Sequence, residues 1–281
     1  MRLPRRFILQ PILLLRGRSP WVCYPQGRGI EENGGDGKVA QRSTPDAPVI
    51  VTETEHGWRC ITQPDHAHLS HEILALWRAD GVPDHPRRRE LLTAVREHDN
   101  GWREADSAPR LDVARGCPRD FITHPHGDRL SIWRRGVERF AEEKPYVAAL
   151  ILEHAIYLHR ERRGEPDWHD FLAECDARRL ELTSELDIDA RTLEADYRWL
   201  HLADLLSLTA CSGWAAPFER EGVSGRLDGE TLHLDPFPLA GATAFTIPCR
   251  YLSRGEYGSD AELATALAVC RWQSWPLRLA P

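Results

Sequence analysis

The chain reads Ala94-Val95-Arg96-Glu97-His98-Asp99-Asn100-Gly101-Trp102 where an apolar helical pattern is about to break at a glycine. Leu91, Val95 and His98 are four and three residues apart, so they share one face of a helix, and Asp99 lies beside them. That face is expected to point into the core, where an ionised carboxylate is costly unless it is hydrogen-bonded or bound to a metal. The pair His98-Asp99 therefore needs partners from elsewhere in the chain.

Asp204 is the first candidate partner. Apolar residues recur every three or four positions around it, at Leu193, Tyr197, Leu200, Leu208 and Cys211. An unpaired carboxylate in the middle of such a stripe would be strongly destabilising, or its pKa would shift until it became neutral. A metal ion or a strong hydrogen-bond donor is the better account of Asp204.

Two histidines add further inward-facing groups. His154 lies in the almost wholly apolar segment 146–158, and His66 lies in the first turn of a helix for which Asp65 is a candidate N-cap. Each also has an ordinary interpretation, since His154 can be a satisfied core histidine and His66 a capping or surface residue. His124, His126 and His201 are further candidates that the sequence does not place.

Imidazole nitrogen and carboxylate oxygen together suit a divalent ion, and we expect Mn²⁺, Fe²⁺, Co²⁺, Zn²⁺ or Mg²⁺. The seven cysteines are scattered and include no Cys-x-x-Cys pair. This usage indicates buried thiols in a reducing compartment, which we take to be the cytoplasm, rather than a disulfide framework or a thiolate zinc site. A buried hydrogen-bond network needs the same residue types as a metal site, so the sequence leaves both open.

The order His66, His98-Asp99, Asp204 on a helical body resembles the HD-domain metal-dependent phosphohydrolase superfamily. That resemblance implies that these four residues bind the metal. It also implies a mainly α fold, an HD-domain-like helical bundle.

Several longer stretches carry a second resemblance: Val49-Ile50-Val51, Glu55-His56-Gly57-Trp58, Gln63-Pro64-Asp65-His66-Ala67, His98-Asp99-Asn100-Gly101-Trp102, Gly116-Cys117-Pro118-Arg119-Asp120-Phe121 and Asp204-Leu205-Leu206-Ser207-Leu208. Through them, residues 49 to about 281 resemble a bacterial family catalogued as domain-of-unknown-function family 3891. Such proteins usually begin with methionine where Val49 stands. Residues 1–48 are therefore expected to be a disordered extension or the product of a mis-called start. An export signal is the alternative, although the apolar run at 7–15 is short and is interrupted by Gln10 and Pro11.

The HD resemblance implies a metal-dependent hydrolase of a phosphoester in a small molecule or nucleotide. Arg119 is a candidate catalytic donor to the phosphate, with Arg103, Arg110 and Arg115 in the same irregular loop, and His154 is a second candidate catalytic residue. Some HD relatives with extra inward histidines hold two metals, so a non-haem di-iron oxygenase of HD-like fold is one alternative. A non-catalytic binding module that keeps the helices is the other.

Charge narrows the class of partner. The net charge is −7, and residues 1–48 carry eight arginines and lysines against four acids, which leaves the remainder near −11. An acidic body does not favour binding of a nucleic-acid polymer, which needs several cations on one face. No apolar run approaches the roughly 20 residues that a membrane-spanning helix needs. A small molecule or nucleotide is therefore the expected partner.

Strand patterns lie on both sides of the helical body. Residues 50–54 and 58–62 alternate around His56-Gly57 and predict a β-hairpin, and residues 231–234 and 245–251 alternate near the C-terminus. We expect three parts: an extension at 1–48, an HD-like helical domain at 49–215, and a small β-rich (α+β) appendage at 216–281. The appendage is expected to wall one side of a pocket or to form a homodimer interface.

Overall fold

The computed structural model describes residues 50–79 and 81–281, so the predictions for residues 1–48 lie outside the described residues. Its helices are α1 (Gln63–Ala75), α2 (Arg88–Glu97), η2 (Asn100–Trp102), α3 (Arg103–Ser107), α4 (His126–Ala141), α5 (Pro145–His159), η3 (Arg160–Arg162), α6 (Pro166–Glu185), α7 (Ala190–Ser212) and α8 (Asp260–Val269). Its strands are β1 (Ile50–Glu53), β2 (Gly57–Ile61), β3 (Leu111–Asp112), β4 (Cys117–Pro118), β5 (Phe218–Arg220), β6 (Val223–Asp228), β7 (Thr231–Asp235), β8 (Thr243–Ser253) and β9 (Gln273–Ala280).

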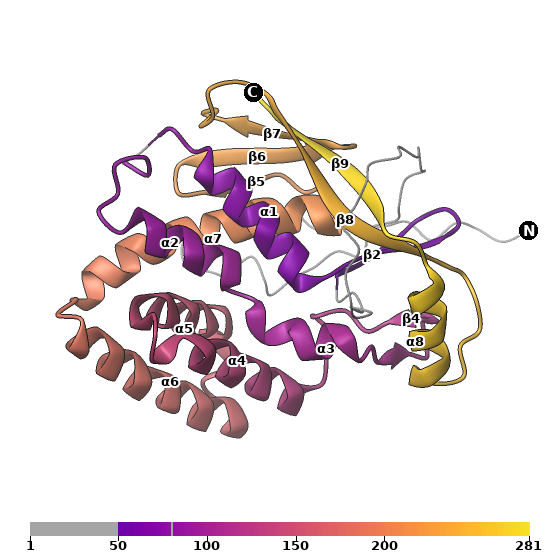
Figure 1. Cartoon of the computed structure of the whole chain (residues 1–281), viewed down its shortest axis with the longest axis horizontal. Helices are drawn as coiled ribbons and strands as arrows, with labels where there is room; N and C mark the ends of the chain where they lie inside the picture. The colour runs from indigo at the N-terminus through magenta and orange to yellow at the C-terminus, as the bar shows by residue number, and fades with distance from the viewer. Residues whose placement is uncertain (1–49, 80) are drawn as a thin grey trace, which may run out of the picture.

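A curled seven-stranded sheet covers one side of the helices (Figure 1). Its strand order is β1-β2-β8-β9-β7-β6-β5, and all neighbours are antiparallel except β7 and β9. The predicted hairpin is confirmed, since β1 pairs with β2 and Ile50 lies opposite Ile61. The hairpin then joins the C-terminal strands, because β2 pairs with β8 and Trp58 lies opposite Leu252.

The prediction of a mainly α fold with a small β-rich appendage is wrong. The fold is α+β, with the large curled sheet as one of its main components and a second, two-stranded sheet formed by β3 and β4. Alternating residues reveal each strand locally, but pairing between β2 and β8 depends on contacts between distant parts of the chain. The sheet takes strands from both sides of residue 216, and the division into three parts stays a prediction.

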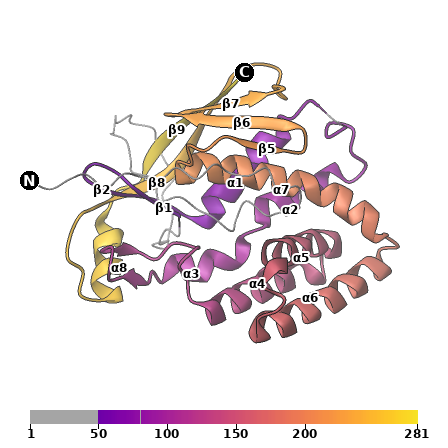
Figure 2. The same ribbon diagram turned by 180° about the vertical axis from the view of Figure 1, so that it is seen from behind.

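Three layers follow from the packing of the helices. α1 contacts β8 and α7 contacts β1, so these two helices lie against the sheet. α2 packs on α1 and on α5, and α4 and α6 pack on α5 (Figure 2). One apolar core joins the layers, because Ile61 of β2, Leu206 of α7 and Leu277 of β9 belong to the same buried cluster. The faces that the middle-layer helices α1, α2 and α7 turn toward one another are therefore screened from water, whereas the outer face of α2 carries exposed residues.

Side-chain caps fix where several helices begin. Asp189 accepts a hydrogen bond from the Thr192 amide and caps α7, and Ser259 accepts from the Glu262 amide and caps α8. The N-cap of α1 is Thr62 rather than Asp65. Thr62 Oγ1 accepts from the Asp65 amide and also lies 2.6 Å from Asp65 Oδ2, so both polar residues stabilise the first turn.

The described cysteines are all free, and five of the six are buried. Cys23 lies outside the described residues. In the part of the chain that the structure describes, none of the helices is long and apolar enough to cross a membrane.

Candidate metal centre

His66 is placed by the start of α1. It follows the capped first turn and is fully buried, with 0% of its surface exposed. The same turn is tied to α3, because the Gln63 amide donates to Asp106 Oδ2 over 3.0 Å. The sequence interpretation of His66 as a surface or capping residue is therefore wrong, since its ring points into the middle layer.

The turn after α2 places His98 and Asp99. α2 ends at Glu97, and Asn100 Nδ2 donates to the carbonyl of Glu97 and to that of Gly136 on α4. Gly101 lies against α4 so closely that a Cβ there would be 2.1 Å from the carbonyl oxygen of Ile132. Asparagine and glycine are thus required for this turn to lie on α4, which holds the preceding His-Asp pair in position.

Two long helices bring the other residues. His154 on α5 and Asp204 on α7 are each 1% exposed, and both lie in segments that are buried almost throughout. The side chain of Asp204 points into the core because it shares a face of α7 with Leu200 and Leu208. These two residues lie one turn before and one turn after it and are also buried. Four helical elements thus deliver five ionisable side chains to one place.

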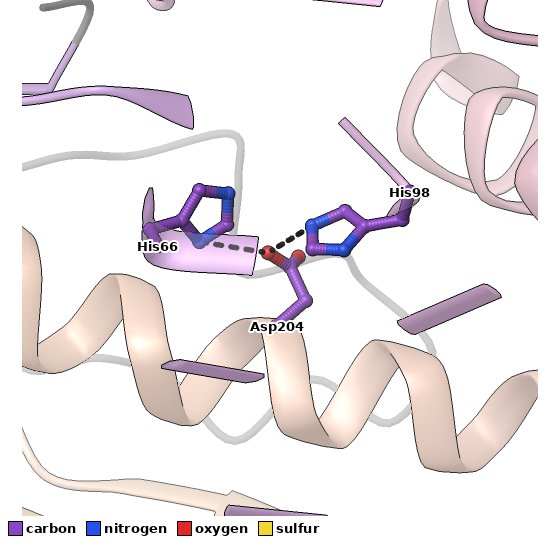
Figure 3. A group of neighbouring side chains, drawn as sticks. All are labelled: His66, His98 and Asp204. Atoms are coloured by element: carbon purple, nitrogen blue, oxygen red, sulfur yellow. Dashed lines mark hydrogen bonds and ion pairs between the residues drawn. The ribbon is translucent and has the colours of Figure 1, made fainter. Parts of the chain in front are cut away.

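These side chains converge. His98 Nε2 lies 3.2 Å from Asp204 Oδ1, and His66 Nε2 lies 2.9 Å from Asp99 Oδ2. His154 Nε2 lies 3.7 Å from Asp204 Oδ2. Figure 3 shows His66 and His98 on either side of the Asp204 carboxylate. Two overlapping groups, His66/His98/Asp204 and His98/Asp99/His154, have ligand atoms within 4.8 Å of one another and could hold a metal ion.

The Nδ1 atom of each histidine is held by a partner, and Nδ1 of His66 also lies 3.9 Å from Asp204 Oδ1. Nδ1 of His66 lies 2.9 Å from Ser207 Oγ, Nδ1 of His98 lies 2.7 Å from the Val95 carbonyl, and Nδ1 of His154 lies 3.0 Å from Tyr197 Oη. Each contact leaves Nε2 directed at a carboxylate of the cluster. Histidine ligands to metals are commonly oriented in this way by a hydrogen bond to the other ring nitrogen.

Ser207 and Tyr197 were not predicted as members of the site. Ser207 Oγ also contacts Ser70 Oγ at 2.7 Å and donates to the Asp204 carbonyl. A small hydroxyl inside the apolar run around Leu206 was its only sequence signal. Tyr197 carried none, because a tyrosine in an apolar stripe reads as an ordinary core residue.

The charges of the cluster are unbalanced without a cation. Asp204 Oδ2 is buried and has no hydrogen-bond donor among the described residues. Burial alone would lower the pKa of His98, but the charge of Asp99 and the hydrogen bond to Asp204 raise it to about 9. Burial and the neighbouring His98 hold the pKa of His154 well below its ordinary value. Two carboxyl groups thus face an imidazole whose charged form they favour, and the unpaired Asp204 oxygen is placed to bind a cation.

The spacing of the ligand atoms also fits a metal. Bonds of roughly 2.1 Å from a metal to nitrogen or oxygen place adjacent ligand atoms about 3 Å apart. The contacts between histidine Nε2 and carboxylate oxygen atoms in the cluster range from 2.9 to 3.7 Å. The residues present therefore fit a divalent ion in donor type, charge and spacing.

The other sequence candidates lie outside the cluster. Arg119 Nε donates to the Leu111 carbonyl, and none of its contacts within the described ranges reaches the five residues. His124 packs against Trp102, His126 against Trp168, and His201 is stacked on Tyr197. Their roles as ligands, and that of Arg119 as a catalytic group, stay predictions.

Comparison with known proteins gives one match. Residues 49–254 match the model of a family described as "Protein of unknown function (DUF3891)". The matched range contains all five residues of the cluster. No curated protein and no solved structure matches the chain.

Proposed function

The chain belongs to the family of unknown function DUF3891, and for this member we propose a metal-dependent hydrolase that cleaves a phosphoester of a small molecule or nucleotide. The metal would be held by His66, His98, Asp99, His154 and Asp204. The resemblance to HD-domain phosphohydrolases is part of this proposal, and it rests on the order and convergence of these residues and not on the overall fold.

The unpaired oxygen of Asp204 carries the proposal. Its Oδ2 has an imidazole 3.7 Å away but no hydrogen-bond donor, in a place where only 1% of the residue is exposed. Leaving a buried charged oxygen unpaired is strongly unfavourable. A non-catalytic module stabilised by its own hydrogen bonds would pair that oxygen, so the observation favours a metal over a closed polar network.

One metal ion accounts best for the donor set. The two overlapping groups together offer three imidazoles and two carboxylates, and an ion held by either group would keep positions open for water or substrate. The two candidate groups share His98, and a single imidazole nitrogen has one lone pair to give to one metal. A mixed nitrogen and oxygen set suits Mn²⁺, Fe²⁺, Co²⁺ or Zn²⁺ better than Mg²⁺, which prefers oxygen ligands.

A divalent metal at this place would lower the pKa of a water and polarise a phosphoryl oxygen. The protein's own groups would orient that water, since Ser207, Val95 and Tyr197 fix the imidazoles. The side chain of Asp99 is the most exposed of the five at 9%, so substrate would approach from its side. Burial lowers the pKa of His124, which packs against Trp102, and Arg129, Arg110 and Arg119 lower it further while Asp128 raises it.

A di-iron oxygenase is the second candidate function. Asp204 has His98 on Oδ1 and His154 on Oδ2, so its carboxylate is placed to bridge two ions. Two irons would need more ligands than these five residues provide. The number of metals per chain separates this candidate from the hydrolase.

The test combines metal content with hydrolysis. We expect the purified full chain to carry one equivalent of a transition metal by mass spectrometry. We also expect it to release nitrophenol from p-nitrophenyl phosphate or bis(p-nitrophenyl) phosphate, to lose this activity after chelation, and to regain it on reloading. His98→Gln should abolish both metal binding and hydrolysis.

His56→Gln is the matched control, because the side chain of His56 is 74% exposed and its ion-pair partner, Glu55, is not one of the cluster residues. It should keep both properties. Two irons per chain with oxygen consumption would replace the hydrolase by the oxygenase. Purified protein without stoichiometric metal would refute the proposal. Hydrolysis of the esters by the His98→Gln variant at the wild-type rate would also refute it.

A further inference from the structure

The outer face of α2 forms a groove with two adjoining hollows. One measures about 520 Å³ and lies between α2, α1 and the end of α4, and the other measures about 390 Å³ and lies toward the start of α5. They share Arg89, Thr93 and Lys144. We call these two hollows together the α2 groove.

The α2 groove is strongly basic in an otherwise acidic chain. Its cations are Arg87, Arg88, Arg89, Arg96 and Lys144, against the two acids Glu90 and Glu97. Glu97 is already engaged, because its Oε2 accepts from Arg103 Nη2 over 2.6 Å and its Oε1 lies 3.7 Å from Arg96 Nε. The groove therefore offers an excess of positive charge to a ligand.

Four of the five cations form no ion pair with a carboxylate among the described residues, and Arg96 is the exception. Arg89 and Lys144 are exposed, and no carboxylate of residues 50–79 or 81–281 forms an ion pair with either. Arg88 is anchored instead, since its Nη2 donates to the Ala75 carbonyl, and its Nε is a buried donor without a partner in the described part of the chain. On an ordinary solvated helix face, arginines of this density would be interleaved with acids as ion pairs.

The spacing of the cations sets the size of the ligand. Arg89, Thr93 and Arg96 follow one face of α2 at intervals of four and three residues. Seven residues of helix span about 10 Å, which is more than a single phosphate can bridge. Phe140 and Leu92 form an apolar part of the lining, and Lys144 lies 5.7 Å from the Phe140 ring centroid. The volume of the larger hollow lies within the roughly 300–1,000 Å³ usual for small-molecule sites.

We propose that the α2 groove is a binding site for a small molecule that carries two or more linked phosphates. Arg89 and Arg96 contact its two ends, Lys144 contacts it from the start of α5, and the side chain of Thr93 lies between the two arginines. The site is separate from the metal centre, since its residues point outward from α2 whereas His98 lies buried beyond the end of that helix. It does not depend on the proposed hydrolase activity.

The test is calorimetric titration of the full chain with sodium tripolyphosphate at low ionic strength. We expect saturable binding with one site per chain, and much weaker binding of inorganic phosphate. The triple variant Arg89→Gln/Arg96→Gln/Lys144→Gln removes three exposed cations, each of which should contribute roughly fivefold, so its affinity should fall about 100-fold.

A matched triple variant, Arg191→Gln/Arg226→Gln/Arg271→Gln, removes three exposed cations elsewhere and should keep the wild-type affinity. Asp99→Asn should also keep it, which would exclude binding at the metal centre. Equal losses in the two triple variants would show a general charge effect and overturn the proposal. So would loss of binding in Asp99→Asn alone, equal affinity for inorganic phosphate, or tight binding of an oligonucleotide that tripolyphosphate does not displace.

Discussion

Two carboxylates on α7 are both buried and yet differ in their partners. Asp196 is 6% exposed and Asp204 is 1% exposed. Asp196 Oδ1 lies 2.7 Å from His85 Nε2, and its Oδ2 accepts a hydrogen bond from the Tyr146 hydroxyl. Asp204 has His98 Nε2 at Oδ1 and no donor at Oδ2. Burial of a carboxylate therefore does not by itself indicate a metal site; at Asp204 the indication comes from the missing donor together with the converging imidazoles.

The comparison extends to the tyrosines. Tyr146 supplies its hydroxyl to Asp196 directly, and Asp196 raises the pKa of Tyr146 in addition to the effect of burial. Tyr197 contacts Nδ1 of His154 instead, and so acts on the cluster through an imidazole. One network is complete in itself, and the other directs nitrogen atoms toward a shared centre.

The largest expected difference in metal binding is between the Asp204→Asn and Asp196→Asn variants. Asp204→Asn should abolish stoichiometric metal binding, because it removes a charged ligand. Asp196→Asn should keep the metal but lower the free energy of unfolding by about 1–3 kcal/mol, since it disturbs a buried hydrogen-bonded carboxylate. Metal at 100 times its dissociation constant should stabilise wild type and Asp196→Asn by about 2.7 kcal/mol.

Asp204→Asn should gain no stability from added metal. Denaturant unfolding with and without metal measures all three proteins. Equal metal-dependent stabilisation of both variants would contradict this difference, because it would show that neither carboxylate is needed to bind the metal.

The next difference is between two Tyr→Phe changes. Tyr197→Phe should weaken metal affinity about 10- to 100-fold, the usual effect of removing a partner that orients a histidine ligand. Tyr146→Phe should leave metal affinity unchanged and lower the free energy of unfolding by about 1–3 kcal/mol. Competition with a chromophoric chelator measures the affinities. If only Tyr146→Phe weakened metal binding, the metal would belong to the network around Asp196 and not to the cluster around Asp204.

The smallest expected effect concerns two buried histidines with opposite shifts. Carboxylates raise the pKa of His98 to about 9, whereas burial, with Arg220 and Arg160, lowers the pKa of His201 to about 3. The unfolded chain binds a proton at His201 near pH 6.5, so stability is complete above that pH and is lost as the pH falls toward 3.

We expect His201→Gln to reduce the loss of stability between pH 6.5 and pH 5 in metal-free protein by up to about 2 kcal/mol relative to wild type. Chemical denaturation at several pH values measures this. A pH dependence identical to that of wild type would show that His201 is not held neutral by the fold.

The site was more predictable than the fold. His98-Asp99 and Asp204 were singled out because a charged residue inside an apolar helical stripe is costly, and that cost is visible in local spacing. The structure brings both together with His66 and His154. Asp196 was missed, because its partners His85 and Tyr146 come from other segments and give no local signal.

The sheet was missed for a similar reason. The hairpin at β1 and β2 and the alternation in β8 were both visible, but strand periodicity carries no information about which strands pair across the length of a domain. Pairing of Trp58 with Leu252 depends on the whole helical body returning the chain to that edge. The free-energy cost of a charged residue in an apolar helical stripe thus predicts a site residue from local sequence. The pairing of the strands depends on tertiary contacts that local sequence does not reveal.

X-ray absorption spectroscopy at the absorption edge of the bound metal would identify the atoms that bind it. The account predicts a first shell of nitrogen and oxygen atoms at about 2.0–2.2 Å, with the multiple-scattering pattern of several imidazoles and no sulfur at about 2.3 Å. A sulfur ligand or a shell without imidazole would contradict a metal site built from His66, His98, Asp99, His154 and Asp204. So would purified protein that shows no metal absorption edge.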